Sequence, residues 1–124
     1  MYGYVLQDWI TMALPAGGTT IQNESDWLGF SSFQDIVFWV EVKTVSAGTV
    51  TINLQTAPTK DDVLFNTLTN CTVGATGATN TVLKNILSTN PAIPLATWVR
   101  WTLSGSVAAT ITFRILASAN RVAA

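Results

Sequence analysis

The stretch from Gln34 to Pro58 constrains the fold more than any other part of this sequence. Apolar side chains occupy every second position on each side of a short connection at residues 46–48. Alternation with a period of two is typical of strands that bury one face and wet the other. We therefore expect a β-hairpin of two long strands, in which Gly48 supplies a positive φ in the turn. The predicted inward-facing positions are Phe38, Val40 and Val42 before the turn, and Val50, Ile52 and Leu54 after it.

The same alternation returns near the C-terminus, in Thr97–Leu103 and Ala109–Leu116, which a short polar turn separates. Strands at this spacing, joined by polar turns, favour an all-β chain that forms a single antiparallel β-sandwich, jelly-roll-like in architecture. Arg100 and Arg114 are expected on one outer face, near Glu41. The predicted core positions here are Val99, Trp101 and Leu103 in the first segment, and Ile111, Phe113 and Ile115 in the second.

The segment Met1–Leu14 is apolar and aromatic, and strong turn signals follow it at Pro15–Gly18. Two interpretations stay open: a first strand of the sandwich, or an arm that reaches a neighbouring molecule. We accordingly divide the chain into an N-terminal strand or arm at residues 1–18 and a β-sandwich domain at residues 19–124. The apolar spacing of residues 82–87 fits a strand and a short helical turn equally.

Charge is scarce in this chain of 124 residues. Charged side chains make up 10% of the sequence, against a typical ~25%, and the formal net charge is −1. Such a surface does not attract nucleic acid or anionic lipid, and it is easily buried against another protein. We expect a homo-oligomer, most simply a trimer, or docking on a larger assembly, with no nucleic acid and no membrane as partners. The alternative is a soluble monomer with a threonine-rich exterior.

The N-terminus reads as neither a signal peptide nor a membrane span. It lacks the basic region of a signal peptide, and Asp8 interrupts its apolar run. No uninterrupted apolar run in the chain approaches the ~20 residues that cross a bilayer.

The sequence offers little for catalysis or metal binding. It has no histidine and a single cysteine, Cys71, which excludes Ser-His-Asp and Cys-His arrangements, histidine-based zinc sites and thiolate clusters. Cys71 opens the least ordered-looking tract, Cys71–Asn80, and is interpreted as a small half-buried residue rather than a reactive thiol. The adjacent Asp61 and Asp62 are interpreted as a solvated turn, with a calcium site as the alternative. We expect no enzyme activity, no catalytic residue, no cofactor and no metal.

Five tryptophans are many for a chain of this length. Trp39 and Trp98 share strand faces with polar residues. Exposed aromatic side chains often mark binding surfaces, because they bury a large area at a low entropy cost. Three interpretations compete: stacking on a sugar, contact with another protein, and ordinary packing in the core or on a strand face. The candidate protein-interface residues are Tyr2, Tyr4, Trp9 and Trp27.

Several segments between Asp26 and Ser118 carry a likeness to a known family. They are Asp26-Trp27, the run Asp35–Gln55, the run Leu54–Phe65 (LQTAPTKDDVLF), Trp98–Trp101 (WVRW) and Ile111–Ile115 (ITFRI). They resemble small β-sandwich proteins encoded among the structural genes of tailed bacteriophages. The resemblance implies a head decoration (cement) protein. Such proteins bind as trimers on the outside of an icosahedral shell and reinforce contacts between its capsomers.

This resemblance predicts a non-enzymatic virion structural protein, made in the host cytoplasm, that binds the major capsid protein on the capsid exterior and stabilises the shell. The segment Met1–Leu14 lies outside the resemblance. We expect it to supply part of the shell contact if it is an arm. The alternative function is a carbohydrate-binding module, or a tail-associated adhesin, of similar β-sandwich fold.

Overall fold

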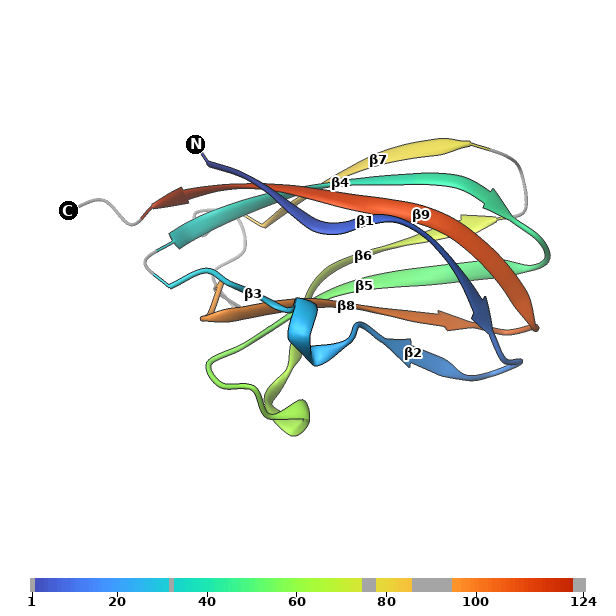
Figure 1. Ribbon diagram of the computed structural model, residues 1–124, viewed down its shortest axis with the longest axis horizontal. Helices are drawn as coiled ribbons and strands as arrows, with labels where there is room; N and C mark the ends of the chain where they lie inside the picture. The colour runs from blue at the N-terminus through green and yellow to red at the C-terminus, as the bar shows by residue number, and fades with distance from the viewer. Residues whose placement is uncertain (1, 32, 75–77, 86–94, 122–124) are drawn as a thin grey trace.

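The computed structural model describes residues 2–31, 33–74, 78–85 and 95–121, which form two antiparallel sheets packed face to face (Figure 1). Sheet A consists of β1 (Tyr2–Leu14), β4 (Phe33–Val45), β7 (Thr79–Asn85) and β9 (Ala109–Arg121). Sheet B consists of β2 (Thr19–Ile21), β3 (Leu28–Gly29), β5 (Thr49–Ala57), β6 (Asn66–Gly74) and β8 (Trp98–Gly105). Two short 3₁₀ helices, η1 (Glu24–Asp26) and η2 (Asp62–Leu64), complete the described elements. Neither these nor any other helix in the described ranges has the length and apolar character to cross a membrane.

The strand order is that of a jelly roll. Sheet A runs β1-β9-β4-β7 and sheet B runs β2-β8-β5-β6, with β3 also paired to β8. Each sheet interleaves early and late strands, and all the pairs are antiparallel, as in two Greek keys wound together. The expectation of a single antiparallel β-sandwich, jelly-roll-like in architecture, is confirmed. The first strand lies along the last, so the start of β1 and the end of β9 lie at the same end of the sandwich (Figure 1).

The predicted β-hairpin between Gln34 and Pro58 is wrong. Strand β4 pairs with β9 and β7 in sheet A, whereas β5 pairs with β8 and β6 in sheet B. The connection at residues 46–48 therefore crosses from one sheet to the other at the right-hand end of Figure 1, with Gly48 at a φ of 61°. The turn between β8 and β9 crosses in the same way. Alternation shows which face of a strand is buried, but it does not show which strand lies beside it.

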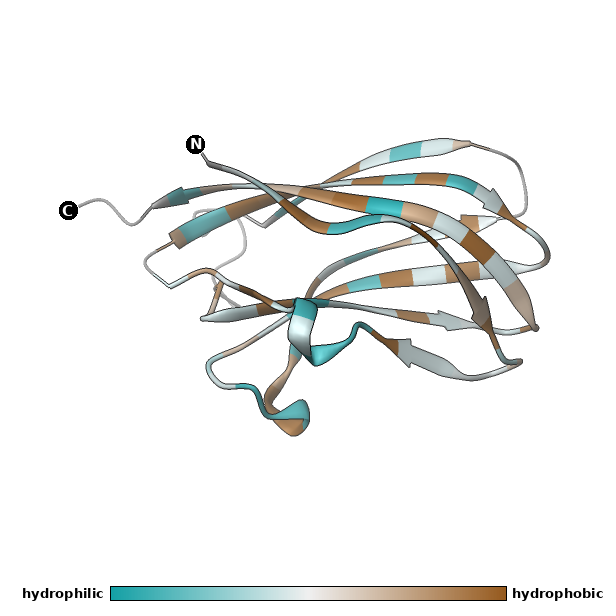
Figure 2. Ribbon diagram, in the orientation of Figure 1, coloured by the Kyte–Doolittle hydropathy of each residue, from teal (hydrophilic) through white to brown (hydrophobic). Residues whose placement is uncertain are grey.

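The inward faces follow the alternation. Figure 2 shows apolar and polar positions alternating along the long strands, and the inward positions fill the space between the sheets. The rings of Phe113 from sheet A and Trp101 from sheet B meet edge to face, with centroids 5.1 Å apart. The predicted core positions are all buried: Phe38, Val40, Val42, Val50, Ile52, Leu54, Val99, Trp101, Leu103, Ile111, Phe113 and Ile115.

Segments with two sequence interpretations have one described conformation. Residues 2–14 form strand β1, an edge strand paired with β9, with Leu6 and Leu14 buried in the core. Residues 82–85 are part of strand β7, and residues 86–87 lie outside the described ranges. In the tract Cys71–Asn80, the first four residues continue β6 and the last two begin β7, whereas residues 75–77 lie outside the described ranges.

The amide side chain of Gln22 holds β1 against sheet B. The register of β1 against β9 shifts twice between Val5 and Ile10, and Leu6, whose carbonyl lies in this stretch, has no paired residue on β9. The buried Gln22 donates from Nε2 to this carbonyl at 2.8 Å, and its Oε1 accepts from the backbone N–H of Trp101 at 3.3 Å. Its own carbonyl accepts from the indole N–H of Trp27 at 2.9 Å. One residue thus joins a bulged strand of sheet A, strand β8 and the η1 segment.

Phe113→Ala should lower the free energy of unfolding by about 3–5 kcal/mol, from lost transfer energy plus the cavity left behind. Thr112→Ala, on the outer face of the same strand, should cost less than about 1 kcal/mol, since it removes only a hydroxyl pair with Thr11. Urea unfolding of both variants measures this. A larger loss for Thr112→Ala would mean that the faces of β9 are inverted.

Gln22→Leu should lower the free energy of unfolding by about 2–4 kcal/mol, because each buried polar group left without a partner costs ~1–3 kcal/mol. Gln34→Leu is the matched control at a half-buried position of β4, where no side-chain hydrogen bond to the described residues is lost. Equal urea midpoints for the two variants would show that Gln22 does not hold β1 in place.

Candidate functional site

The two sheets differ in what covers their outer faces. Over sheet B, the segments that carry η1 and η2 bury the outward-facing side chain of Arg100 on β8, which is only 4% exposed. No described segment lies over the outer face of sheet A (Figure 1). There Val5 is 55%, Val82 45% and Trp9 39% exposed. The outer face of sheet A, here called the open surface, is therefore left uncovered by the described chain.

An apolar band crosses this open surface. It consists of Val5, Leu116, Trp39 and Val82, one residue from each strand of sheet A. The residues are cross-strand partners in that order, so the band runs across the strands. The outer face of an antiparallel sheet is normally polar, and a continuous apolar band on it typically marks a contact surface.

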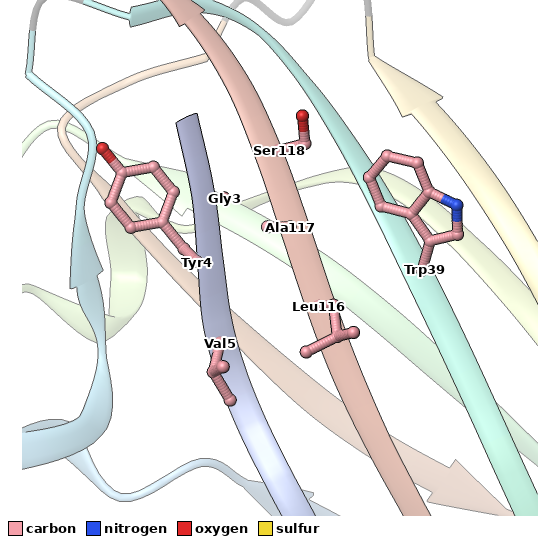
Figure 3. A pocket seen from close by; sticks show the side chains of 7 residues that line it. All are labelled: Gly3, Tyr4, Val5, Trp39, Leu116, Ala117 and Ser118. Atoms are coloured by element: carbon pink, nitrogen blue, oxygen red, sulfur yellow. The ribbon is translucent and has the colours of Figure 1, made fainter. Parts of the chain in front are cut away.

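Three residues of the band, Val5, Leu116 and Trp39, line a hollow of about 380 Å³. Figure 3 shows Val5 of β1 and Leu116 of β9 at one end of this hollow. Trp39, on β4, lies near Ser118 of β9. Gly3 lies within it, and a Cβ built at Gly3 meets no atom within 4 Å. The missing side chain of Gly3 therefore keeps the hollow open. The full lining is Gly3, Tyr4, Val5, Trp39, Leu116, Ala117 and Ser118.

A charged aromatic cluster, the Trp9 cluster, occupies the other end of the open surface. Lys43 Nζ and Arg114 Cζ each lie 4.9 Å from the centre of the Trp9 ring. Arg114 donates two hydrogen bonds to the Glu41 carboxylate, at 2.9 and 3.0 Å, and this pairing raises the pKa of Arg114. Asp8 accepts from the backbone N–H of Trp9 at 2.8 Å. The second register shift of β1 lies between Gln7 and Ile10, so a β-bulge sets the direction in which the Trp9 side chain points.

The four candidate interface residues have different environments. Trp9 is 39% exposed on the outer face of sheet A. Tyr4 packs edge to face on Phe30 and Phe33, with ring centroids 5.0 and 5.9 Å away, and so anchors β1 to the core. The side chain of Tyr2 lies outside the described part of the structure. Trp27 is a correction: it is 7% exposed, because η1 folds it onto β8.

Trp27 belongs to a clamp around Arg100. The Arg100 guanidinium carbon lies 3.8 Å from the centre of the Phe65 ring and 5.0 Å from that of Trp27. Its nitrogens donate to Asp62 at 2.6 Å and to Gln55 at 3.0 Å. The expectation that Arg100 shares an outer face with Arg114 is therefore wrong. Arg114 pairs with Glu41 as predicted, but Arg100 belongs to sheet B and fastens the η1 and η2 segments to it.

The remaining polar candidates have structural roles. Asp61 caps η2 by accepting from the N–H of Val63 at 3.2 Å, and Asp62 pairs with Arg100. These contacts fit the turn interpretation of the two aspartates. Within the described residues, no group of three or more Cys, Asp or Glu side chains is arranged to hold a metal ion. Cys71 is half-buried on β6, and burial raises the pKa of its thiol.

Sequence reasoning recognised part of this surface. Trp39 was identifiable from its place among polar residues on an alternating strand. Val5, Val82 and Leu116 were missed, because a single outward-facing aliphatic residue carries no signal until strand register aligns it with others.

No protein-family model matches the sequence, and no curated protein matches it significantly. Solved structures do match its fold. One belongs to the disulfide-linked pili that form Bacillus endospore appendages (14% identity, 99% of this chain and 93% of that chain, TM-score 0.50). Others are PirA (10% identity, 90% and 93%, TM-score 0.55) and a CBM4 structure (13% identity, 95% and 78%, TM-score 0.60). At these identities, the chain is similar to them in its β-sandwich fold.

Proposed function

We propose that this protein is non-enzymatic and works by protein–protein contact in a multi-copy assembly, through the outer face of sheet A. The contrast between the two sheets carries the proposal. The chain covers the part of sheet B around Arg100 with its own segments but leaves an apolar band uncovered across sheet A. An exposed apolar band costs solubility unless a partner covers it.

The more specific proposal is a head decoration protein of a tailed bacteriophage. It binds the major capsid protein on the capsid exterior, as a trimer, and raises the temperature at which the shell fails. The resemblance of the segments between Asp26 and Ser118 to phage structural proteins supports this role. The scarcity of charge supports it too, because few ions need to be desolvated on docking. The fold is also similar to that of a pilus protein, which supports a role for a β-sandwich of this kind in an assembly of many copies.

The Trp9 cluster is the part of the surface best suited to the shell contact. An indole offers a large contact area for two rotatable bonds, and aromatic and arginine side chains dominate protein interfaces. Lys43 and Arg114 hold the ring of Trp9 on the sheet before any partner arrives. Strand β1 thus contributes to the contact from within sheet A, and no detached arm is needed.

Sugar binding is the second candidate, and one observation favours it. A hollow of about 370 Å³ beside Trp9 is lined in part by Glu41, Lys43 and Asn80. A ring for stacking with a carboxylate and an amide nearby is the usual composition of a sugar site. The fold is also similar to that of a CBM4 structure.

Trp9→Ala should weaken binding to capsids assembled from the major capsid protein of the same genome. A central interface tryptophan is worth about 2 kcal/mol, so we expect an affinity about 30-fold lower, measured by co-sedimentation. Trp98→Ala is the matched control, because Trp98 also lies under a lysine, Lys60 at 4.4 Å, but belongs to sheet B.

Equal capsid binding by both variants and the parent would contradict the role of the Trp9 cluster. A second outcome is that the parent protein does not bind capsids but binds oligosaccharides, and that Trp9→Ala abolishes this binding. The decoration proposal would then fail, and sugar binding would replace it.

A further inference from the structure

We infer that Glu41 is a positioning residue for the contact made by Trp9, and that it acts through the guanidinium of Arg114. The three side chains come from three neighbouring strands of sheet A: Glu41 from β4, Arg114 from β9 and Trp9 from β1. The inference rests on the proposed role of the Trp9 cluster in protein contact, and it names the residue that orders the indole before a partner binds.

The β-bulge in β1 places Trp9 over Arg114. Asp8 and Trp9 lie between two paired positions of β1 and β9, and the single residue Arg114 lies between the same positions on β9. Two residues of β1 therefore oppose one residue of β9, which is the arrangement of a β-bulge. Asp8 accepts from the backbone N–H of Trp9 at 2.8 Å, so its carboxylate fixes the backbone at this point. The indole extends from there onto the Arg114 guanidinium, whose carbon lies 4.9 Å from the ring centre.

Glu41 fixes this guanidinium from the other side. Glu41 is the direct cross-strand partner of Arg114. Its carboxylate accepts from Nε at 2.9 Å and from Nη2 at 3.0 Å, so both oxygens are used and the planar fork has one orientation. The side chains of Glu41 and Arg114 are 27% and 33% exposed, so solvent screens this pair less than it would screen a fully exposed one. An arginine held in this way presents a fixed flat face to the indole.

Lys43 is the other cation at the Trp9 ring, with Nζ 4.9 Å from the ring centre. A lysine ammonium is a compact point charge on a flexible stem, whereas the arginine fork is planar and fits a carboxylate in one geometry. Neither of the two salt bridges between described residues includes Lys43. The contact of Lys43 with the ring therefore adds attraction but sets its orientation less than the Glu41–Arg114 pair does.

The order of the indole matters for binding, because a side chain that is already fixed loses little conformational entropy when a partner covers it. Trp9 is 39% exposed, so part of the ring remains for a partner to cover. Without the Glu41 carboxylate, Arg114 would sample other rotamers and the ring would lose its support. The partner would then have to order the indole itself, and the affinity would fall although Glu41 does not touch the partner.

Glu41→Gln tests this role in the full chain. The substitution keeps the size of the side chain but removes its charge and replaces one of its two acceptor oxygens by a donor. Glu24→Gln is the matched control, because it makes the same change at an exposed position of η1, outside sheet A. Arg114→Lys is a second test variant, since lysine keeps the positive charge but lacks the planar fork that pairs with the carboxylate and stacks on the ring.

The first measurement is the NMR order parameter of the Trp9 indole N–H in the free protein, its signal being the one that Trp9→Ala removes. We expect Glu41→Gln and Arg114→Lys to lower this order parameter, and Glu24→Gln to leave it at the parent value. The second measurement is capsid binding by co-sedimentation. Glu41→Gln should weaken binding about 5-fold, which corresponds to the cost of ordering one side chain. In the Trp9→Ala background it should change binding by less than about 2-fold, because the ring through which it acts is absent.

An unchanged order parameter in Glu41→Gln would overturn the inference. Parent-like capsid binding by Glu41→Gln, when Trp9→Ala binds weakly, would overturn it as well. An equal loss from Glu41→Gln with and without the Trp9 ring would mean that Glu41 contacts the partner directly, which also contradicts the inference. Failure of the proposed function gives a different result. If Trp9→Ala binds capsids as the parent does, the shell contact through the Trp9 cluster fails, while the order parameter alone still decides whether Glu41 positions the indole.

Discussion

The hydrogen bonds of Gln22 are the constraint on which the rest of this structure depends. Strand β1 bulges between Val5 and Ile10, and the carbonyl of Leu6 lies in this bulged stretch. Gln22, which follows β2, donates to that carbonyl and holds the backbone of Trp101 with the same side chain. Because the bulge is stabilised in this way, β1 can stay in sheet A and still turn Trp9 onto the open surface. A buried amide thus links the edge of the core to the candidate site.

The clamp around Arg100 has the opposite effect on the other sheet. Burying an arginine is costly unless its charge and hydrogen-bonding groups are matched, and here Asp62, Gln55 and two aromatic rings match them. The clamp draws the η1 and η2 segments over part of sheet B and leaves Val63 of η2 exposed. One sheet is partly covered by the chain itself and the other is not, so the sandwich has two distinct sides. That asymmetry is what an assembly built by directional contacts requires.

Much of the fold was predictable from alternation, and its limits are physical. The inward faces of β4, β5, β8 and β9 follow directly from the period of two. The partners of these strands do not, because a strand that faces another across the core has the same pattern as one that lies beside it. This is why a hairpin was expected where the chain crosses between sheets. Trp27 near a turn carried no sign of its burial, and the apolar band became visible only once strand register placed Leu116 between Val5 and Trp39.

Hydroxyl-radical footprinting of side chains tests the central claim, that the outer face of sheet A is a protein contact surface. The protein would be labelled free at low concentration and again on assembled particles. Trp39 and Leu116 should lose reactivity on the particles, whereas Trp98 of sheet B should react equally in both states. Unchanged reactivity of Trp39 and Leu116 in particles that contain the protein would contradict the account.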